Sequence, residues 1–266
     1  MLTVNEILSI ENHKSSRSLF SWSRLSLASD SPFSAALVKY FLASLLAGFF
    51  VGLGILLIMT VGGLTKSYGP IFRIFMGVSF GIALSLVIMA GSELFTGNNM
   101  VMSAGVFTKS VKFKDLFDIW VLSYLGNLAG SILVGILFVY SGAGNAPHKQ
   151  VGEFIIALSK LKGAMPIIPL LMRGILCNIL VCLAVLCSLK MKSESGKLIM
   201  IWWCLFAFIT CGFEHSIANM SIFSAGLFLP NSPITLGPVI HNLLWATVGN
   251  IIGGSLLGIV YAYMGN

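Results

Sequence analysis

The chain has 266 residues, of which 57% are hydrophobic and 9% charged, and its mean hydropathy is +0.95. So few charges cannot cover the surface of a soluble globule of this size, and the composition therefore predicts an integral membrane protein. The apolar runs are continuous instead of alternating, which argues against an outer-membrane barrel and predicts an all-α fold. The formal net charge of +7 comes from Lys and Arg beside the apolar runs, so it does not indicate nucleic-acid binding.

The N-terminal segment precedes the first apolar stretch. It carries Lys14, Arg17 and Arg24, but no apolar run followed by a small-residue cleavage site, so it does not resemble a secretory signal. We expect residues 1–33 to form a cytoplasmic segment and residues 34–266 to form one transmembrane domain.

Six apolar stretches follow, measured against the roughly 20 residues that a helix needs to cross a bilayer. They cover residues 41–64, 74–108, 119–147, 163–189, 198–231 and 238–266. The second and fifth are too long for one simple helix, and each holds one acidic residue, Glu93 or Glu214. We therefore expect six transmembrane helices, with breaks in the second and the fifth.

The basic residues outside these stretches predict the orientation. With the N-terminus inside, ten Lys and Arg residues lie in inner segments and five in outer segments. Because basic loops stay on the cytoplasmic side, both termini are predicted to lie in the cytoplasm and the protein in the inner membrane. The five on the outer side are Lys66, Arg73, Lys149, Lys160 and Lys162.

Polar motifs interrupt the two long stretches and resemble each other. Gly91-x-Glu93 recurs as Gly212-x-Glu214, and each is followed closely by an Asn-Met pair. Unpaired backbone is not tolerated in lipid, so each break must be buried in protein or line a cavity.

Further downstream, each motif is followed by a Gly-Asn pair. Gly126-Asn127 lies 33 residues after the first glutamate, and Gly249-Asn250 lies 35 after the second. Gly48 and Gly174 are candidate counterparts in the leading helices. Three spans per copy is an odd number, so the copies, at about 36–141 and 163–264, must cross the membrane in opposite senses.

The breaks are also the candidate site. Unpaired N–H groups and the positive end of a broken helix favour negative charge, which predicts an anion site between the breaks. Glu93 and Glu214 would repel an anion, so we expect them to be structural acceptors for those N–H groups. His215 can stay neutral, donate a hydrogen bond to an anion and take up a proton, although a buried structural histidine is the alternative. Thr96 offers a hydroxyl from the other break.

Several motifs resemble the formate/nitrite transporter family. Segments 91–98 and 212–220 resemble the two broken-helix motifs of the family; segments 174–184 and 201–204 and the paired Gly-Asn motifs also match. The resemblance covers roughly residues 36 to 264. Segments 81–84, 90–93, 201–205 and 241–245 look most like the nitrite channel branch.

The resemblance implies an aquaporin-like protomer with its own pore, assembled as a homopentamer in the lipid bilayer. It would pass a small monovalent anion or, with a proton, the neutral acid. Nitrite is favoured by the branch alone; formate and hydrosulfide stay open, as do passive flux and proton coupling. Asn127 and Asn250 would hold the breaks in shape.

The resemblance also implies roles along the pore. Phe80 and Leu84, with the loop of Phe95 and Thr96, would form a cytoplasmic constriction, and Phe208, with Asn178 and Val181, a periplasmic one. His215 would lie between them, facing Thr96. The vestibule lysine of the family corresponds to Lys162, with Lys160 as the alternative.

An intramembrane enzyme is the remote alternative. Glu214-His215 lacks the second histidine of a His-Glu-x-x-His metalloprotease motif. The three aspartates, Asp30, Asp115 and Asp118, lie outside the apolar stretches, so an aspartyl type is not indicated. The five cysteines lie within the stretches without metal-type spacing, and we expect no metal and no cofactor.

Overall fold

The computed structural model describes residues 33–144 and 149–265. In this part of the chain all regular elements are helices, which confirms the all-α prediction. The prediction for residues 1–33 falls, apart from Phe33, outside the described residues. In chain order the elements are α3 (Phe33–Thr65), the short 3₁₀ helix η2 (Lys66–Ile71), α4 (Phe72–Ser79), α5 (Gly81–Ala90), α6 (Phe95–Phe107), α7 (Phe113–Tyr140), α8 (Lys149–Gly163), α9 (Ile167–Lys190), α10 (Glu194–Cys211), α11 (Ser216–Phe228) and α12 (Leu236–Gly265).

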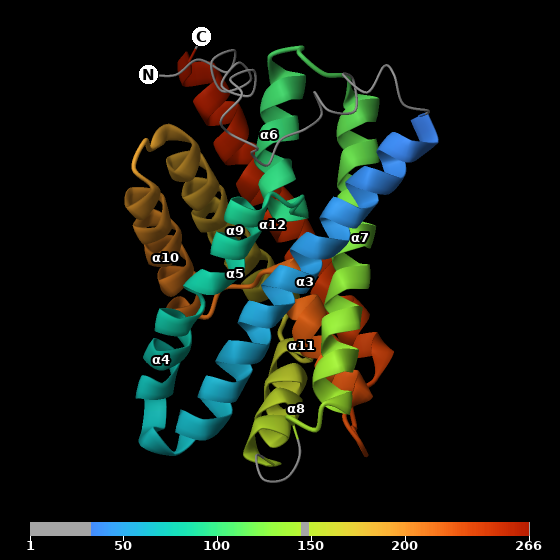
Figure 1. Ribbon diagram of the computed structural model, residues 1–266, viewed down its shortest axis with the longest axis vertical. Helices are drawn as coiled ribbons and strands as arrows, with labels where there is room; N and C mark the ends of the chain where they lie inside the picture. Colours follow the sequence, from blue (N-terminus) through green and yellow to red (C-terminus); the bar gives the residue numbers. More distant parts are fainter. Residues whose placement is uncertain (1–32, 145–148, 266) are drawn as a thin grey trace.

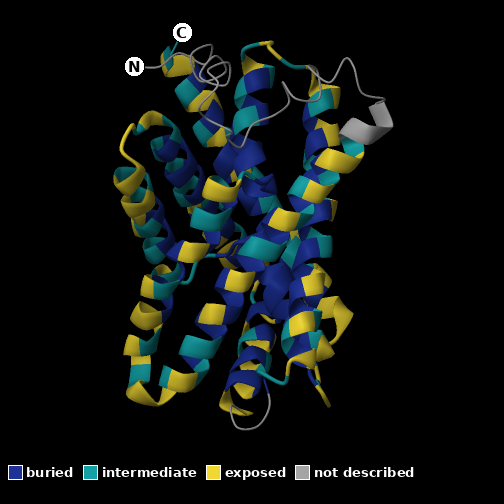
Figure 2. Ribbon diagram, viewed as in Figure 1, coloured by how far each residue is buried: buried dark blue, intermediate teal, exposed yellow. Residues whose placement is uncertain are grey.

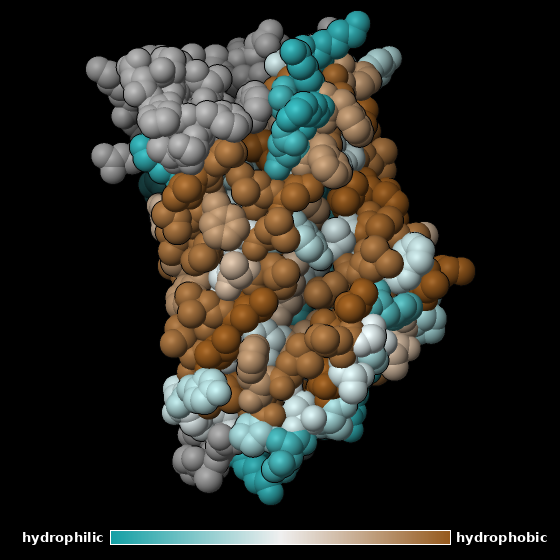
Figure 3. Space-filling model, turned by 90° about the vertical axis from the view of Figure 1, so that its right-hand side faces the viewer, coloured by the Kyte–Doolittle hydropathy of each residue, from teal (hydrophilic) through white to brown (hydrophobic). Residues whose placement is uncertain are grey.

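Five segments of the described chain are long and apolar enough to cross a membrane. The first, Leu37–Ala90, is a hairpin, because η2 turns the chain so that α4 runs back beside α3 (Figure 1). The face seen in Figure 3 has a broad hydrophobic belt with hydrophilic side chains toward both ends. A belt of this kind is the surface that lipid tails require.

Two helix interruptions lie near mid-height of the molecule, one between α5 and α6 and one between α10 and α11 (Figure 1). α5 ends at Gly91 with φ +73°, and α10 ends at Gly212 with φ +72°. Glycine adopts this left-handed conformation without the steric cost that a Cβ brings. The buried residues gather around these interruptions, with α6 and α11 in the centre (Figure 2). The predicted breaks are therefore present, at the two predicted motifs.

Glycines four residues after those of the Gly-Asn pairs bring helices into close contact. α7 crosses α3, and α12 crosses α9, at glycines that leave no room for a side chain. A methyl group at Gly130 would lie 2.0 Å from the backbone oxygen of Leu45, and one at Gly253 would lie 2.3 Å from that of Ile175. Small residues of this kind are the common means of packing helices closely in membranes.

Gly48 gives a test of this packing. A Cβ there would lie 2.0 Å from the backbone oxygen of Asn127, so Gly48→Ala must separate α3 from α7. We expect it to destabilise the protein by about 3 kcal/mol, the upper end for overpacking, seen as a lower melting temperature in detergent. Gly237→Ala is the matched control, since nothing lies within 4 Å of its Cβ position. Equal melting temperatures for the two variants would contradict the close contact.

One expected loop is a helix. The sequence predicts an outer segment between the third and fourth apolar stretches but no helix in it, and α8 occupies Lys149–Gly163 there. Its buried residues Val151, Phe154 and Ile155 recur at helical spacing on one face. A criterion of about 20 consecutive apolar residues does not detect α8, because this helix is short and carries charges.

Candidate functional site

Two asparagines hold the interruptions in the same way. At the first, the N–H of Phe95 donates to Oδ1 of Asn127, and Nδ2 of Asn127 donates to the backbone oxygens of Ser44 and Glu93. At the second, the N–H of Ser216 donates to Oδ1 of Asn250, at 2.8 Å. Nδ2 of Asn250 then donates to the oxygens of Gly174 and Glu214, both at 2.9 Å. Both asparagines are fully buried. One backbone N–H at each break, that of Phe95 or of Ser216, thus donates to an asparagine and not to the predicted glutamate.

These equivalent bonds correct the alignment of the two motifs. Gly174 matches Ser44, not Gly48, because both supply the backbone oxygen that accepts from the asparagine. Likewise, Asn98 matches Asn219, since each lies five residues after the glutamate; the expected pairing through the Asn-Met dipeptides is one residue off. In the same alignment Leu94 is equivalent to His215, and these are the N-cap residues of α6 and α11.

The hydrogen bonds of His215 determine which ring nitrogen carries the proton. The backbone N–H of Ala218 donates to Nδ1 at 3.0 Å, capping the first turn of α11. A nitrogen that accepts this bond cannot carry a hydrogen, so the neutral ring is protonated at Nε2. Nε2 lies 3.0 Å from Oγ1 of Thr96. Leu94 has no ring nitrogen and forms no side-chain cap, so this residue gives the first interruption no counterpart of the Nε2–H donor of His215.

Asn178 donates a hydrogen bond to the backbone oxygen of Thr96. Its side-chain Nδ2 lies 3.1 Å from the Thr96 oxygen, 3.1 Å from Oδ1 of Asn99 and 2.6 Å from the Asn250 oxygen. These acceptors engage both hydrogens of the NH2 group, and Asn178 is not among the residues that line the cavity described below. The structure thus brings Asn178 to the site, but as a link between α6, α9 and α12.

The aromatic residues form one cluster beside His215. The rings of Phe80 and Phe208 meet edge to face, with centroids 5.4 Å apart, and Phe208 lies nearly parallel to the imidazole of His215 at 6.0 Å. The sequence predicts Phe80 and Phe208 at separate constrictions, and the structure brings their rings into contact. The assignment of the two rings to two constrictions stays a prediction. Leu84 and Val181 are buried within the same core.

Phe95 has a different setting. Its ring packs edge to face against Tyr124, with centroids 5.0 Å apart, and against Trp120, at 6.4 Å. Both partners belong to α7. Phe95 is thus fixed at the start of α6, next to Thr96, and is not in contact with the Phe80 and Phe208 pair by any ring interaction of the described residues.

A cavity of about 240 Å³ extends between Lys66, in η2, and the second interruption. Phe208, Glu214 and His215 are among the residues that line it. Four cationic side chains line it as well, against the single carboxylate: Lys66, Arg73, Lys162 and Arg173. An excess of positive charge in a confined space raises the local concentration of anions.

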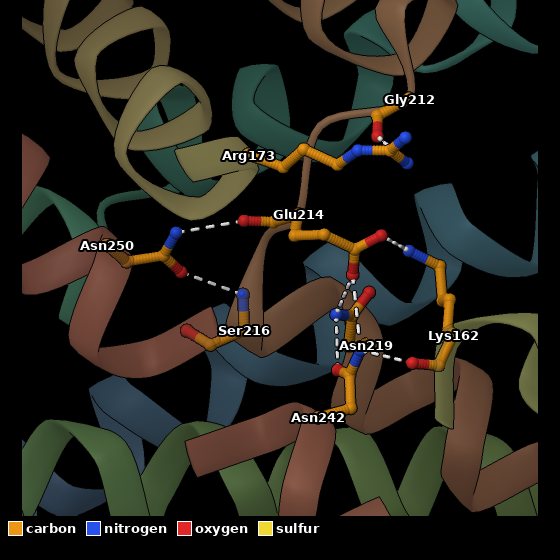
Figure 4. Close-up of polar contacts among 8 residues, drawn as sticks. All are labelled: Lys162, Arg173, Gly212, Glu214, Ser216, Asn219, Asn242 and Asn250. Atoms are coloured by element: carbon orange, nitrogen blue, oxygen red, sulfur yellow. Dashed lines mark hydrogen bonds and ion pairs between the residues drawn. The ribbon is translucent and has the colours of Figure 1, made fainter. Parts of the chain in front are cut away.

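Lys162 is an internal partner of Glu214. Nζ of Lys162 lies 2.7 Å from Oε1 of Glu214, and the side chains are 11% and 2% exposed. The other carboxylate oxygen accepts from Nδ2 of Asn219 at 2.6 Å, and Asn242 joins Asn219 to the backbone oxygen of Lys162 (Figure 4). Lys160 is exposed and does not line this cavity. Of the two alternatives, Lys162 is the lysine at the cavity.

Glu93 has an analogous setting at the first interruption. It is 7% exposed and interacts with the hydroxyl of Tyr40. That hydroxyl also accepts from Nδ2 of Asn98 at 2.8 Å. Asn98 and Asn219 therefore belong to corresponding networks, one completed by a tyrosine and the other by a lysine.

Three cavity residues were not recognised in the sequence as part of the site. The sequence predicts Lys66 and Arg73 only as charges of outer segments, and it assigns Arg173 no role. Arg173 instead lines the cavity and points to the second interruption (Figure 4). Its position inside the apolar stretch 163–189 was the signal, since charged residues in such stretches are usually functional. Within residues 33–144 and 149–265, no group of three or more His, Cys, Asp or Glu could hold a metal ion.

Comparison with known proteins identifies the family. The family model described as "Formate/nitrite transporter" matches residues 24–264. The chain belongs to the formate/nitrite transporter family. It is 43% identical over 227 residues to the nitrite transporter NirC of Escherichia coli, covering 84% of this chain and 82% of the relative. The resemblance found in the sequence is confirmed, and membership of a transporter family agrees with the prediction that the chain is not an enzyme.

Solved structures of the family share the fold. An FNT family ion channel superposes with a TM-score of 0.81 at 38% identity, covering 91% of this chain and 93% of the other. A pentameric formate channel with formate bound gives a TM-score of 0.77 at 26% identity, covering 88% and 98%. The formate/nitrite transporter fold is therefore that of this chain.

Proposed function

We propose that this protein is a channel that passes nitrite, as the anion or as the neutral acid, across the inner membrane. The observation that carries the proposal is the Nε2–H of His215, held toward Thr96 beside a cavity with four cationic side chains and one carboxylate. Similarity to a nitrite transporter supports nitrite as the substrate. Formate is the second candidate, supported by similarity to a channel with formate bound; no feature of the described residues favours hydrosulfide.

His215 would stabilise the anion by donating a hydrogen bond. Because Nδ1 is occupied by the Ala218 N–H, a second proton there would set two donors against each other. Proton release from Nε2 of the neutral ring would leave an imidazolate, which is a costly species in an apolar site. Hydrogen bonding is therefore favoured over proton donation, and the neighbouring Phe80 and Phe208 would exclude water from the crossing anion.

The proposed architecture has six transmembrane helices in two inverted halves. The hairpin of α3 with α4 and α5 explains why five apolar segments can contain six crossings. The equivalent bonds of Asn127 and Asn250 support the two halves. The α6–α7 and α9–α10 connections lie at the same end as the C-terminus (Figure 1), and their lysines support a cytoplasmic position for that end.

We propose a homopentamer, by analogy with the pentameric formate channel. Native mass spectrometry of the purified protein tests the subunit number, and a mass other than five subunits would contradict it.

Transport tests the substrate. The protein is reconstituted into liposomes, and uptake of nitrite, formate and hydrosulfide is compared at two pH values. We expect nitrite uptake at least as fast as formate uptake. Faster hydrosulfide or formate uptake would contradict nitrite as the principal substrate, and uptake of none of the three would contradict the channel function.

A further inference from the structure

Two arginines from different helices meet at the second interruption. Arg173 of α9 donates from Nη1 to the backbone oxygen of Gly212, and the atoms are 3.4 Å apart. Arg73 of α4 approaches the same residue, since a Cβ on Gly212 would lie 3.6 Å from its Nη1. Both arginines line the cavity that His215 also lines. The two guanidinium groups are therefore neighbours on the way to the histidine.

These arginines are two of the three cavity cations that form no ion pair among the described residues, Lys66 being the third. Lys162 is neutralised by Glu214 at 2.7 Å. Among the described residues, neither Arg73 nor Arg173 forms an ion pair with a carboxylate, and both are exposed. The bond from Arg173 to Gly212, at 3.4 Å, is longer than the usual N–H···O range, so an anion can replace it.

The chemistry of guanidinium goes beyond positive charge. It is planar and presents parallel N–H groups that match two oxygens of one anion, whereas the ammonium of lysine acts as a point charge. Nitrite and formate each offer two oxygens on one central atom. Hydrosulfide offers a single sulfur and cannot satisfy the two N–H groups in this way.

We propose that Arg73 and Arg173 form an anion-selecting site at Gly212 that favours planar anions with two oxygens over hydrosulfide. The site rests on the proposed channel function and adds selectivity to it. The arginines are exposed whereas His215 and Phe208 are buried, so an anion that enters from solvent would meet the guanidinium groups first. The site would bind by hydrogen bonding and charge together.

Substitution by lysine separates these two contributions. Arg73→Lys and Arg173→Lys keep the charge but lose the paired N–H groups. In proteoliposomes, we expect the nitrite and formate concentrations at half-maximal uptake to rise about tenfold in the double variant, with hydrosulfide uptake unchanged. The double alanine variant should lower uptake of all three anions, since charge is lost as well.

The controls distinguish this proposal from its alternatives. Lys160→Ala removes an exposed charge outside the cavity and should leave all three uptakes as in the wild type. Gel filtration must show the same assembly for each variant. Arg73→Lys alone serves if the Arg173 variant fails to assemble, since Arg173 bonds to Gly212.

The outcomes are separable. Equal effects of the lysine substitutions on all three anions, or no effect, would overturn the selecting site while leaving the channel in place. A wild-type protein that carries none of the three would overturn the channel function itself. A selective loss of nitrite and formate uptake supports the site.

Discussion

Replacing His215 with asparagine is expected to lower nitrite uptake about 10- to 100-fold while leaving the assembly intact. Asparagine is one of the best N-cap residues, so its oxygen can accept the Ala218 N–H that Nδ1 now accepts. It is too short to place a donor where Nε2 lies. A hydrogen bond to a charged group contributes about 1.5–3 kcal/mol. Losing this free energy while the anion crosses the pore corresponds to the expected decrease in uptake rate.

A second variant separates the cap from the donor. His215→Phe removes both, and because the cap alone is worth about 1 kcal/mol, we expect it to melt at a lower temperature than His215→Asn. Both variants should be equally slow in uptake if the Nε2–H is what the anion needs. Uptake by His215→Asn at the wild-type rate would show that the histidine is only a cap, which is the structural alternative considered from the sequence.

Uptake at several pH values tests the hydrogen-bonding role further. If His215 acts through a neutral ring, the loss caused by His215→Asn should be similar at each pH once uptake is scaled to the anion present. A loss that grows steeply at low pH would instead indicate proton donation by an imidazolium. The bond from Ala218 to Nδ1 argues for the first result.

The sequence was sufficient to locate the interruptions and the histidine. Glycine, carboxylate and amide side chains stand out inside apolar stretches, since lipid tolerates unpaired polar groups poorly. Asn127 and Asn250 could be associated with the breaks because each directly follows a glycine and lies at nearly the same distance after the glutamate of its break. Their bonds to Phe95 and Ser216 show why both copies keep that residue.

Other features depend on contacts between distant residues, which composition and spacing do not contain. Lys162 and Glu214 are 52 residues apart, so a lysine near the end of α8 could not be paired with its carboxylate from the sequence. The contact between Phe80 and Phe208 depends on how α4 and α5 lie against α10, so the sequence alone does not show it. Asn98-Asn99 offers two alignments to Asn219; the spacing from each glutamate favours Asn98, and the hydrogen bonds of Asn98 and Asn219 agree with it.

Breaking the Lys162 to Glu214 pair is expected to destabilise the protein more than any surface change. Lys162→Met leaves the carboxylate of Glu214, which is 2% exposed, without its cation. Removing one partner of a buried pair typically costs about 3–5 kcal/mol, because the remaining charge is neither hydrated nor paired. The bonds from Asn219 and Asn242 would remain, and they can stabilise the carboxylate only in part. Thermal unfolding of the detergent-solubilised protein measures the loss.

The double variant tests whether the unpaired charge is the cause. Adding Glu214→Gln to Lys162→Met removes the charge while retaining an oxygen that can accept from Asn219. We expect the double variant to recover more than half of the lost stability, since a neutral side chain is far less costly to bury. Lys160→Met is the matched control on the same helix and should change stability by no more than about 0.5 kcal/mol, because that side chain is exposed. If the double variant were less stable than Lys162→Met, the carboxylate would be needed for more than this pair. In that case the network of Asn219 and Asn242, which joins α11 and α12, would be what holds Glu214 in place.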